Sequence, residues 1–78
     1  MAPSEILSLL QDRYPDIDWN VETDGYHFQV EGVGEAFAGL NAVKRQQLVY
    51  AALNPLITSG ALHAVIIKTF TPAEKAGV

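Results

Sequence analysis

Residues 60–74 read GALHAVIIKTFTPAE and contain two helix boundaries around one apolar run. Gly60 is a typical residue after a helix C-terminus, because glycine adopts the left-handed conformation without strain. The run LHAVIIKTF over 62–70 is apolar on both alternating faces, which predicts a strand that is not an edge strand with one side in water. The sequence TPAE over 71–74 has the pattern of a capping box and predicts a short helical turn near the C-terminus.

The segments before this stretch predict a helix and a hairpin. Ser4 is a candidate N-cap for a first helix that Pro15 ends. Apolar and polar side chains alternate over residues 17–23, as in a strand with one buried face. The dipeptide DG at 24–25 favours a tight turn, and residues 26–31, YHFQVE, alternate again. The two runs therefore predict an antiparallel hairpin.

The longest helix is predicted between Asn41, a candidate N-cap, and the glycine at position 60. Its buried stripe is expected to consist of the apolar residues at helical spacing, which are Val43, Val49, Tyr50 and Leu53. Pro55 lacks an N–H and clashes with the preceding turn, so a kink or a restart of the helix is expected near Asn54.

The order of these elements predicts an α+β protein. We expect a single-domain α-β-β-α-β sandwich, with helices on one face of a small mixed three-stranded sheet and a short C-terminal helical turn. The 78 residues bury too little surface for a second core, so one domain over 1–78 is expected. No apolar stretch has the length of a membrane span and no signal-like segment begins the chain, so a soluble, cytoplasmic protein that does not bind membranes is expected.

Charge is divided unevenly along the chain, whose net charge is −4. Residues 1–35 contain eight acids and one arginine, whereas residues 36–78 have a net charge of +3. One modest basic face is therefore compatible with the acidic total. Lys44 and Arg45 in the long helix and Lys68 in the third strand are candidates for a face toward a partner or a nucleic acid, and the alternative for the helix pair is a solvated helix surface.

The two histidines are the candidates for metal chemistry. The chain has no cysteine, and its serines have no nucleophile setting with His and Asp partners, so we expect neither an enzyme nor a small-molecule substrate. Burying a polar nitrogen without a partner costs roughly 1–3 kcal/mol, so His63 is either hydrogen-bonded or exposed. Together, His27 and His63 could complete an iron–sulfur cluster for which another protein supplies thiolates, and a structural role for each remains the alternative.

The second half of the chain resembles the BolA-like proteins. The motifs are F-x-G before the long helix, a basic residue and then V-Y within it, and H-A followed by apolar residues and T-x-T-P-x-E; they correspond to Phe37, Gly39, Arg45, Val49, Tyr50, His63, Ala64, Thr69, Thr71, Pro72 and Glu74. The resemblance covers about residues 4–75. The sequence KRQQ at 44–47, where founding members have an R-H pair, is similar to the short, acid-stress-associated bacterial subgroup.

This resemblance implies a fold related to type II KH domains and a monothiol glutaredoxin with a CGFS motif as partner. In the family, the two proteins form an apo heterodimer or share a [2Fe–2S] cluster, and the isolated chain is expected to hold no cofactor. His63 corresponds to the family's C-terminal cluster ligand. The family places Cys or His in the loop between the first two strands; here the predicted loop is TDG, and His27 lies just past it.

The family also has a DNA-binding, transcriptional-regulator attribution. This chain lacks the histidine that follows the basic residue at position 45 and the GXXG loop of nucleic-acid-binding KH domains. A KH-like regulator of the stress response that binds DNA is therefore the second hypothesis.

Overall fold

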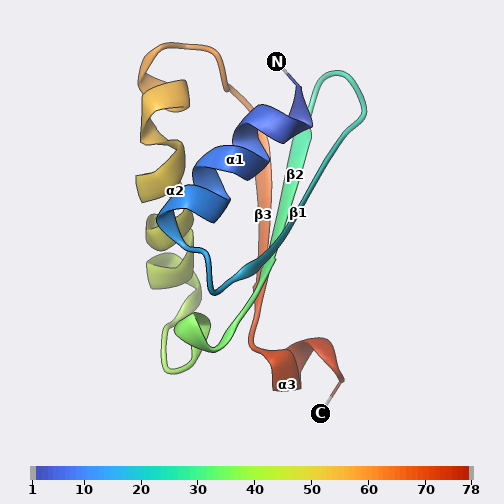
Figure 1. The fold of residues 1–78 in the computed structure, drawn as a ribbon, viewed down its shortest axis with the longest axis vertical. Helices are drawn as coiled ribbons and strands as arrows, with labels where there is room; N and C mark the ends of the chain where they lie inside the picture. The colour runs from blue at the N-terminus through green and yellow to red at the C-terminus, as the bar shows by residue number, and fades with distance from the viewer. Residues whose placement is uncertain (1, 78) are drawn as a thin grey trace.

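The structure, a computed structural model, describes residues 2–77. Its elements follow in the order α1 (Pro3–Arg13), β1 (Asp18–Thr23), β2 (Phe28–Val33), the 3-10 turn η1 (Glu35–Phe37), α2 (Ala42–Thr58), β3 (Val65–Phe70) and α3 (Pro72–Lys75). This confirms the predicted α-β-β-α-β order with a terminal helical turn. The helices α1 and α2 cover one face of the sheet, which Figure 1 shows almost edge-on. The other face, called the open face below, is covered by neither of them.

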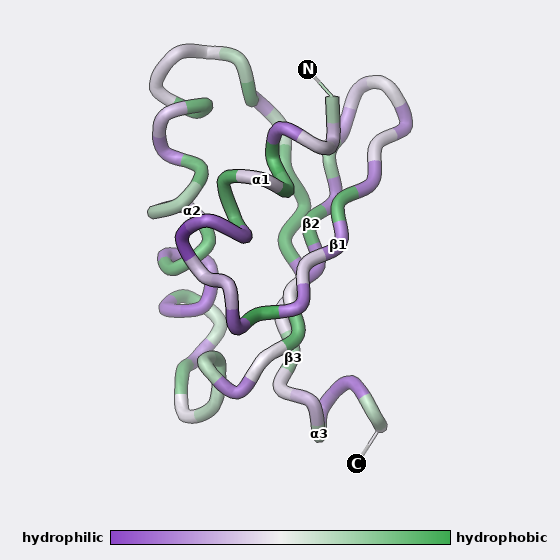
Figure 2. Tube along the Cα trace, in the orientation of Figure 1, coloured by the Kyte–Doolittle hydropathy of each residue, from purple (hydrophilic) through white to green (hydrophobic). Residues whose placement is uncertain are grey.

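The sheet is mixed, as predicted. Its strand order is β1-β2-β3, with β1 antiparallel to β2 and β2 parallel to β3. In β1 the alternation has the expected sense, because Trp19 is buried toward the helices while its neighbours Asp18 and Asn20 are exposed. In Figure 2, purple segments along β1 are separated by pale or green ones.

Trp19 and Gly32, which are opposite each other in the β1–β2 pair, are in close contact in the core. A Cβ added to Gly32 would lie 2.6 Å from Cζ3 of Trp19 and 3.2 Å from Cε2 of Phe37. The rings of Trp19 and Phe37 meet edge to face with their centroids 6.2 Å apart. The indole therefore occupies the space of a side chain on β2, and only glycine leaves that space free.

The helices confirm some of the predicted boundaries and correct others. Asn41 caps α2, because its Oδ1 accepts a hydrogen bond of 2.9 Å from the Lys44 N–H. The first helix begins at Pro3, earlier than expected, and its N-cap is residue 2 instead of Ser4. A proline in the first turn needs no N–H partner and has a helical φ. The helix α2 continues through Pro55 to Thr58, so the expected restart does not occur.

The predicted buried stripe of α2 was partly wrong. Val49 and Leu53 are buried as expected, together with Ala52. Val43 and Tyr50 are instead 63% and 40% exposed. Each residue turns an α-helix by about 100°, so Tyr50 lies more than a quarter turn from Val49 and outside the arc that faces the sheet.

Two predictions about strands were also wrong. The third strand starts at Val65 instead of residue 62, and it is an edge strand, because it pairs only with β2 in the described residues 2–77. Its open-face residue Ile66 is 50% exposed. The second strand starts at Phe28, so Tyr26 lies in the hairpin loop and is 86% exposed. Local apolar content did not show which strands would be neighbours.

An ion pair joins the start of α2 to the C-terminal turn. Arg45 contacts both carboxylate oxygens of Glu74, at 2.7 and 3.2 Å, and its Nε donates to the carbonyl of Leu40 at 2.9 Å. The Arg45 side chain is only 14% exposed, so it does not belong to a solvated helix surface. Glu74 also completes the predicted capping box with Thr71. These contacts fix the end of β3 against α2.

No helix within the described residues is both long and apolar enough to cross a bilayer.

Replacing Gly32 with Ala is expected to lower the free energy of unfolding by about 1–3 kcal/mol, because the new methyl group overlaps the Trp19 ring. Urea denaturation of the variant measures this loss. In the background Trp19→Phe, which removes the overlapping ring atoms, Gly32→Ala should cost clearly less. Equal losses in both backgrounds would contradict the proposed overlap.

The ion pair predicts a contribution of Glu74 to stability that depends on pH. Hydrogen bonds from Arg45, and secondly from the backbone of Thr71, lower the pKa of Glu74 from its usual 4.5 to about 2. Its contribution is therefore fully present above pH 4.5 and is lost as the pH falls toward 2. Urea denaturation across this range should show a shallower pH dependence for Glu74→Gln than for the wild type.

The control for this experiment is Asp12→Asn, which changes an exposed carboxylate on α1 that forms no ion pair with any described residue. This variant should retain the wild-type slope. Identical slopes for Glu74→Gln and the wild type would be inconsistent with the ion pair.

Candidate functional site

The hairpin loop between β1 and β2 carries the first candidate ligand, His27. Thr23 pairs with Phe28 in the ladder, so the loop consists of residues 24–27 and is longer than the predicted two-residue turn. The reason is the side chain of Asp24, whose Oδ1 accepts the backbone N–H groups of His27 at 2.8 Å and of Tyr26 at 2.9 Å. His27 is therefore the last residue of the loop and does not lie past it.

Asp24 also faces the imidazole of His27. Its Oδ2 lies 3.5 Å from His27 Nδ1, and the two side chains are 66% and 60% exposed, respectively. Backbone hydrogen bonds, first from His27 and then from Tyr26, lower the pKa of Asp24 from its usual 3.8 to about 2, so the carboxylate is charged at neutral pH. A carboxylate on Nδ1 favours the tautomer whose Nε2 is free to bind a metal.

The second candidate, His63, is exposed and lies two residues before β3, so the expectation that it belongs to the strand was wrong. Strand pairing starts at Val65 because its partner on β2 is Phe28, the first residue after the hairpin loop. Both neighbours of His63 are nevertheless held. Leu62 is 3% exposed, and the carbonyl of Ala64 accepts the N–H of Phe28 at 3.2 Å.

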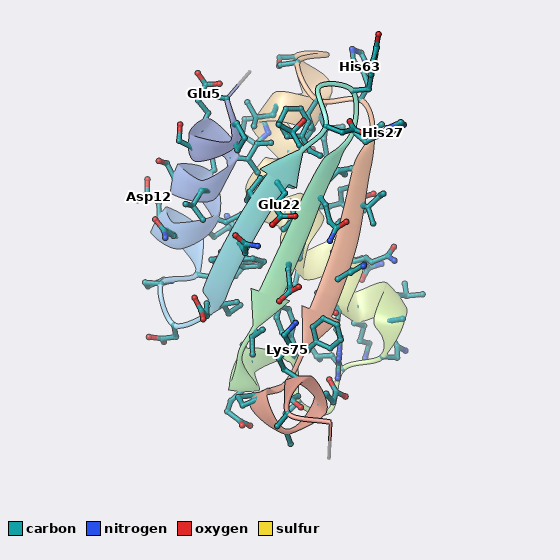
Figure 3. All side chains as sticks on the ribbon, turned by 90° about the vertical axis from the view of Figure 1, so that its right-hand side faces the viewer. Glu5, Asp12, Glu22, His27, His63 and Lys75 are labelled. Carbon is teal, nitrogen blue, oxygen red and sulfur yellow. The ribbon has the colours of Figure 1, made fainter. Side chains whose placement is uncertain are left out.

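The parallel register brings the two histidines to the same end of the sheet, where Figure 3 shows both. His27 immediately precedes Phe28, and His63 precedes the partner of Phe28 by two residues. Neither imidazole is buried, so both can reach a molecule that approaches this end. In the described residues 2–77 no group of three or more His, Asp or Glu side chains could hold a metal ion. A metal bound by these histidines would therefore need further ligands from another molecule.

A shallow hollow lies beside His27 on the open face. Its volume is about 330 Å³, and its lining residues are Glu22, Thr23, Asp24, His27, Gln29 and Ile66. Two carboxylates and an exposed isoleucine thus lie next to one of the two imidazoles. A partner that approached His27 would also contact this acidic surface.

The three predicted basic residues do not form one face. Lys44 is exposed on the helical layer, whereas Lys68 is exposed on the open face, opposite Glu31 in the β2–β3 register. Arg45 is engaged by Glu74. A role for Lys44 or Lys68 in binding a partner stays a prediction, but the structure does not bring them together.

Sequence reasoning missed two residues of this region, Asp24 and Tyr26. The signal for the first was present as the spacing D-x-x-H, in which an aspartate can accept backbone N–H groups two and three residues later. Tyr26 was missed because the alternation of apolar and polar residues starts in the loop, two residues before β2 begins at Phe28.

The chain is similar to known proteins over nearly its whole length. Residues 8–74 match the family model described as BolA-like protein. The chain is 46% identical over 74 residues to acid stress protein IbaG of Escherichia coli K12, which covers 95% of this chain and 88% of that protein.

Solved structures agree with this match. A bolA protein homologue from Coxiella burnetii has a TM-score of 0.83 at 30% identity, with 97% of each chain covered. The BolA domain of SufE1 from Arabidopsis thaliana has a TM-score of 0.80 at 34% identity, with 92% of this chain and 93% of that chain covered. From these similarities, the chain belongs to the BolA-like protein family.

Proposed function

We propose that this protein is a non-enzymatic adaptor that binds a CGFS monothiol glutaredoxin and shares a [2Fe–2S] cluster with it. The observation that carries the proposal is the position of His27 and His63, two exposed imidazoles at one end of the sheet in a chain without cysteine. The role would be iron–sulfur cluster trafficking or iron regulation under stress. The name of the E. coli relative, an acid stress protein, is consistent with the second.

The donor atoms of this chain fit one half of such a cluster. Imidazole nitrogens replace thiolates on one iron in clusters of the Rieske type. His27 and His63 would act as these donors, and thiolates of the glutaredoxin and its glutathione would hold the other iron. The loop position of His27 is consistent with this assignment, because the family resemblance implies a second ligand in the loop between the first two strands, and His27 is the last residue of that loop. The cluster, when bound, would supply electron transfer or be passed on; the chain itself orients two nitrogens.

Two features would hold the imidazoles ready for binding. Asp24 braces the loop through two backbone N–H groups and faces Nδ1 of His27, which keeps Nε2 free. His63 is fixed between buried Leu62 and Ala64, whose carbonyl accepts the N–H of Phe28. A ligand carried on a braced segment loses less conformational freedom when it binds than one on an unrestrained loop.

DNA binding is less well supported. Arg45 uses its guanidinium on Glu74, and the exposed lysines 44 and 68 lie on opposite faces of the sheet. Phosphate recognition requires several cations that face one duplex. DNA therefore becomes the next ligand to test only if the glutaredoxin experiment fails.

The proposal predicts a coloured heterodimer. Co-expression with a CGFS monothiol glutaredoxin and anaerobic purification should give a one-to-one complex with the visible absorption and circular dichroism of a [2Fe–2S] cluster. Replacing His63 with Ala should change the spectrum and lower cluster content severalfold, because one iron loses a ligand. His27→Ala should act in the same direction.

The matched control is Asn20→Ala, an exposed residue on the open face that lies outside the hollow beside His27. It should retain the wild-type spectrum and cluster content. A wild-type spectrum in both histidine variants would exclude histidine ligation. A colourless mixture that never associates would contradict the partnership itself and leave both histidines with structural roles.

A further inference from the structure

We propose that two copies of this chain form a two-fold symmetric dimer in which their β3 strands pair antiparallel and their α2 helices pack side by side. The dimer would have a continuous six-stranded sheet. Two observations carry the proposal independently of any cluster: β3 is an edge strand, and α2 has an exposed apolar stripe on the same side of the molecule.

The outer edge of β3 presents backbone groups that, apart from the Thr69 carbonyl, form no hydrogen bond within residues 2–77. The carbonyls of Ala64 and Phe70 bond to β2, through Phe28 N and Gly34 N. Successive residues of a strand direct their backbone groups to opposite sides, so residues 66 and 68 also face β2. The backbone N–H and C=O groups of Val65, Ile67 and Thr69 therefore point to the outer edge. Of these groups, the Thr69 carbonyl is contacted by Arg45 at 3.4 Å.

This pattern selects a register for two antiparallel copies. Opposed residues must point to the same face of the joined sheet, so the two-fold axis passes through a residue of β3 and not between two residues. The candidates near the middle of the strand are Ile66, Ile67 and Lys68. An axis at Lys68 would oppose two lysines, and an axis at Ile67 would require the Thr69 carbonyl that Arg45 already contacts. With the axis at Ile66, Val65 and Ile67 exchange hydrogen bonds with their counterparts, and the exposed Ile66 side chains meet.

The exposed apolar stripe of α2 can also pair with an antiparallel copy of itself. Val43, Tyr50 and Ile57 are 63%, 40% and 37% exposed and follow one another at intervals of seven residues. This spacing aligns them on one side of a helix, within about 20° per interval. Tyr50 is the centre of the stripe, so an antiparallel copy would place Tyr50 against Tyr50 and Val43 against Ile57.

Tyr50, the centre of the stripe on α2, and Ile66, the proposed centre on β3, lie at about the same level along the length of the α2–β3 layer. Arg45 reaches Thr69 at one end of the α2–β3 layer, and the N–H of Leu62 bonds to Leu56 at the other. The midpoints of these two spans are residues 50–51 on α2 and 65–66 on β3. One axis can therefore pass near Tyr50 and Ile66 together.

The surroundings also favour a second copy of this chain. In Figure 3, β3 is the edge strand on the right, α1 lies beside β1 on the left, and α2 passes behind the sheet with its N-terminal part next to β3. Because its residues are exposed, the stripe lies on a side of α2 that neither α1 nor the sheet covers. Its neighbours on the helix are neutral, Gln46, Gln47 and Asn54. The acids of β1 would be far from the axis, so two chains of net charge −4 can meet here without opposing their acidic strands.

Sedimentation equilibrium of the isolated wild-type chain, from about 10 μM to about 1 mM, should show a monomer–dimer equilibrium. Tyr50→Lys should shift it toward monomer, because it places two charges at the axis. Ala51→Lys adds the same charge at an exposed position on another side of α2 and should leave the equilibrium unchanged. Monomeric wild-type protein throughout this range would overturn the proposal.

Disulfide trapping tests the register, because the chain has no native cysteine. Ile66→Cys would place two thiols across a non-hydrogen-bonded antiparallel pair, where the Cα atoms are about 4.5 Å apart and a disulfide can form. On oxidation it should give covalent dimer at least roughly tenfold faster than Asn20→Cys, an open-face variant distant from the axis. Equal rates would overturn the interface even if the protein dimerises.

Discussion

The parallel pairing of Phe28 with Val65 is the contact on which the other features of this structure depend. It sets the register between a hairpin strand and a strand that arrives after a long helix. Because the hairpin loop ends one residue before Phe28, the same register brings His27 and His63 to one end of the sheet. Within residues 2–77, β3 is paired along one edge only. The site and the proposed dimer contact are thus two results of one strand pairing.

Two groups of contacts hold the elements around this strand pair in place. At the core, the Trp19 ring occupies the space over Gly32 and fixes β1 on β2. At the end of β3 away from the histidines, Arg45 and Glu74 connect α2 to the C-terminal turn. Arg45 belongs to the pattern that relates this chain to its family, and its contacts show a structural reason for a basic residue at that position.

Local patterns were sufficient to predict the elements and their order. The alternation in β1, the caps at Asn41 and Thr71 and the glycine at position 60 each depend on residues that are close in the sequence, and the structure confirms them. Long-range features were harder. The edge position of β3 depends on which strands become neighbours, and the exposure of Tyr50 depends on the angle at which α2 meets the sheet.

The candidate site shows the same division. Sequence and family resemblance selected His27 and His63, but the length of the hairpin loop depends on the Asp24 side chain, which was not recognised. The three basic residues were grouped by charge alone. In the structure, Arg45 is in an ion pair, and Lys44 and Lys68 lie on opposite sides of the sheet. Equal charge does not show whether two residues lie on the same face of the protein.

The most direct test of shared ligation is the detection of nitrogen from this chain at the cluster. The protein would be labelled with 15N-histidine, combined with unlabelled CGFS monothiol glutaredoxin, loaded with the cluster and reduced. Pulsed electron paramagnetic resonance should then detect 15N coupled strongly to the cluster, and this coupling should lose one component in His63→Ala. A cluster without any 15N coupling would contradict the account, because all its ligands would come from the partner side.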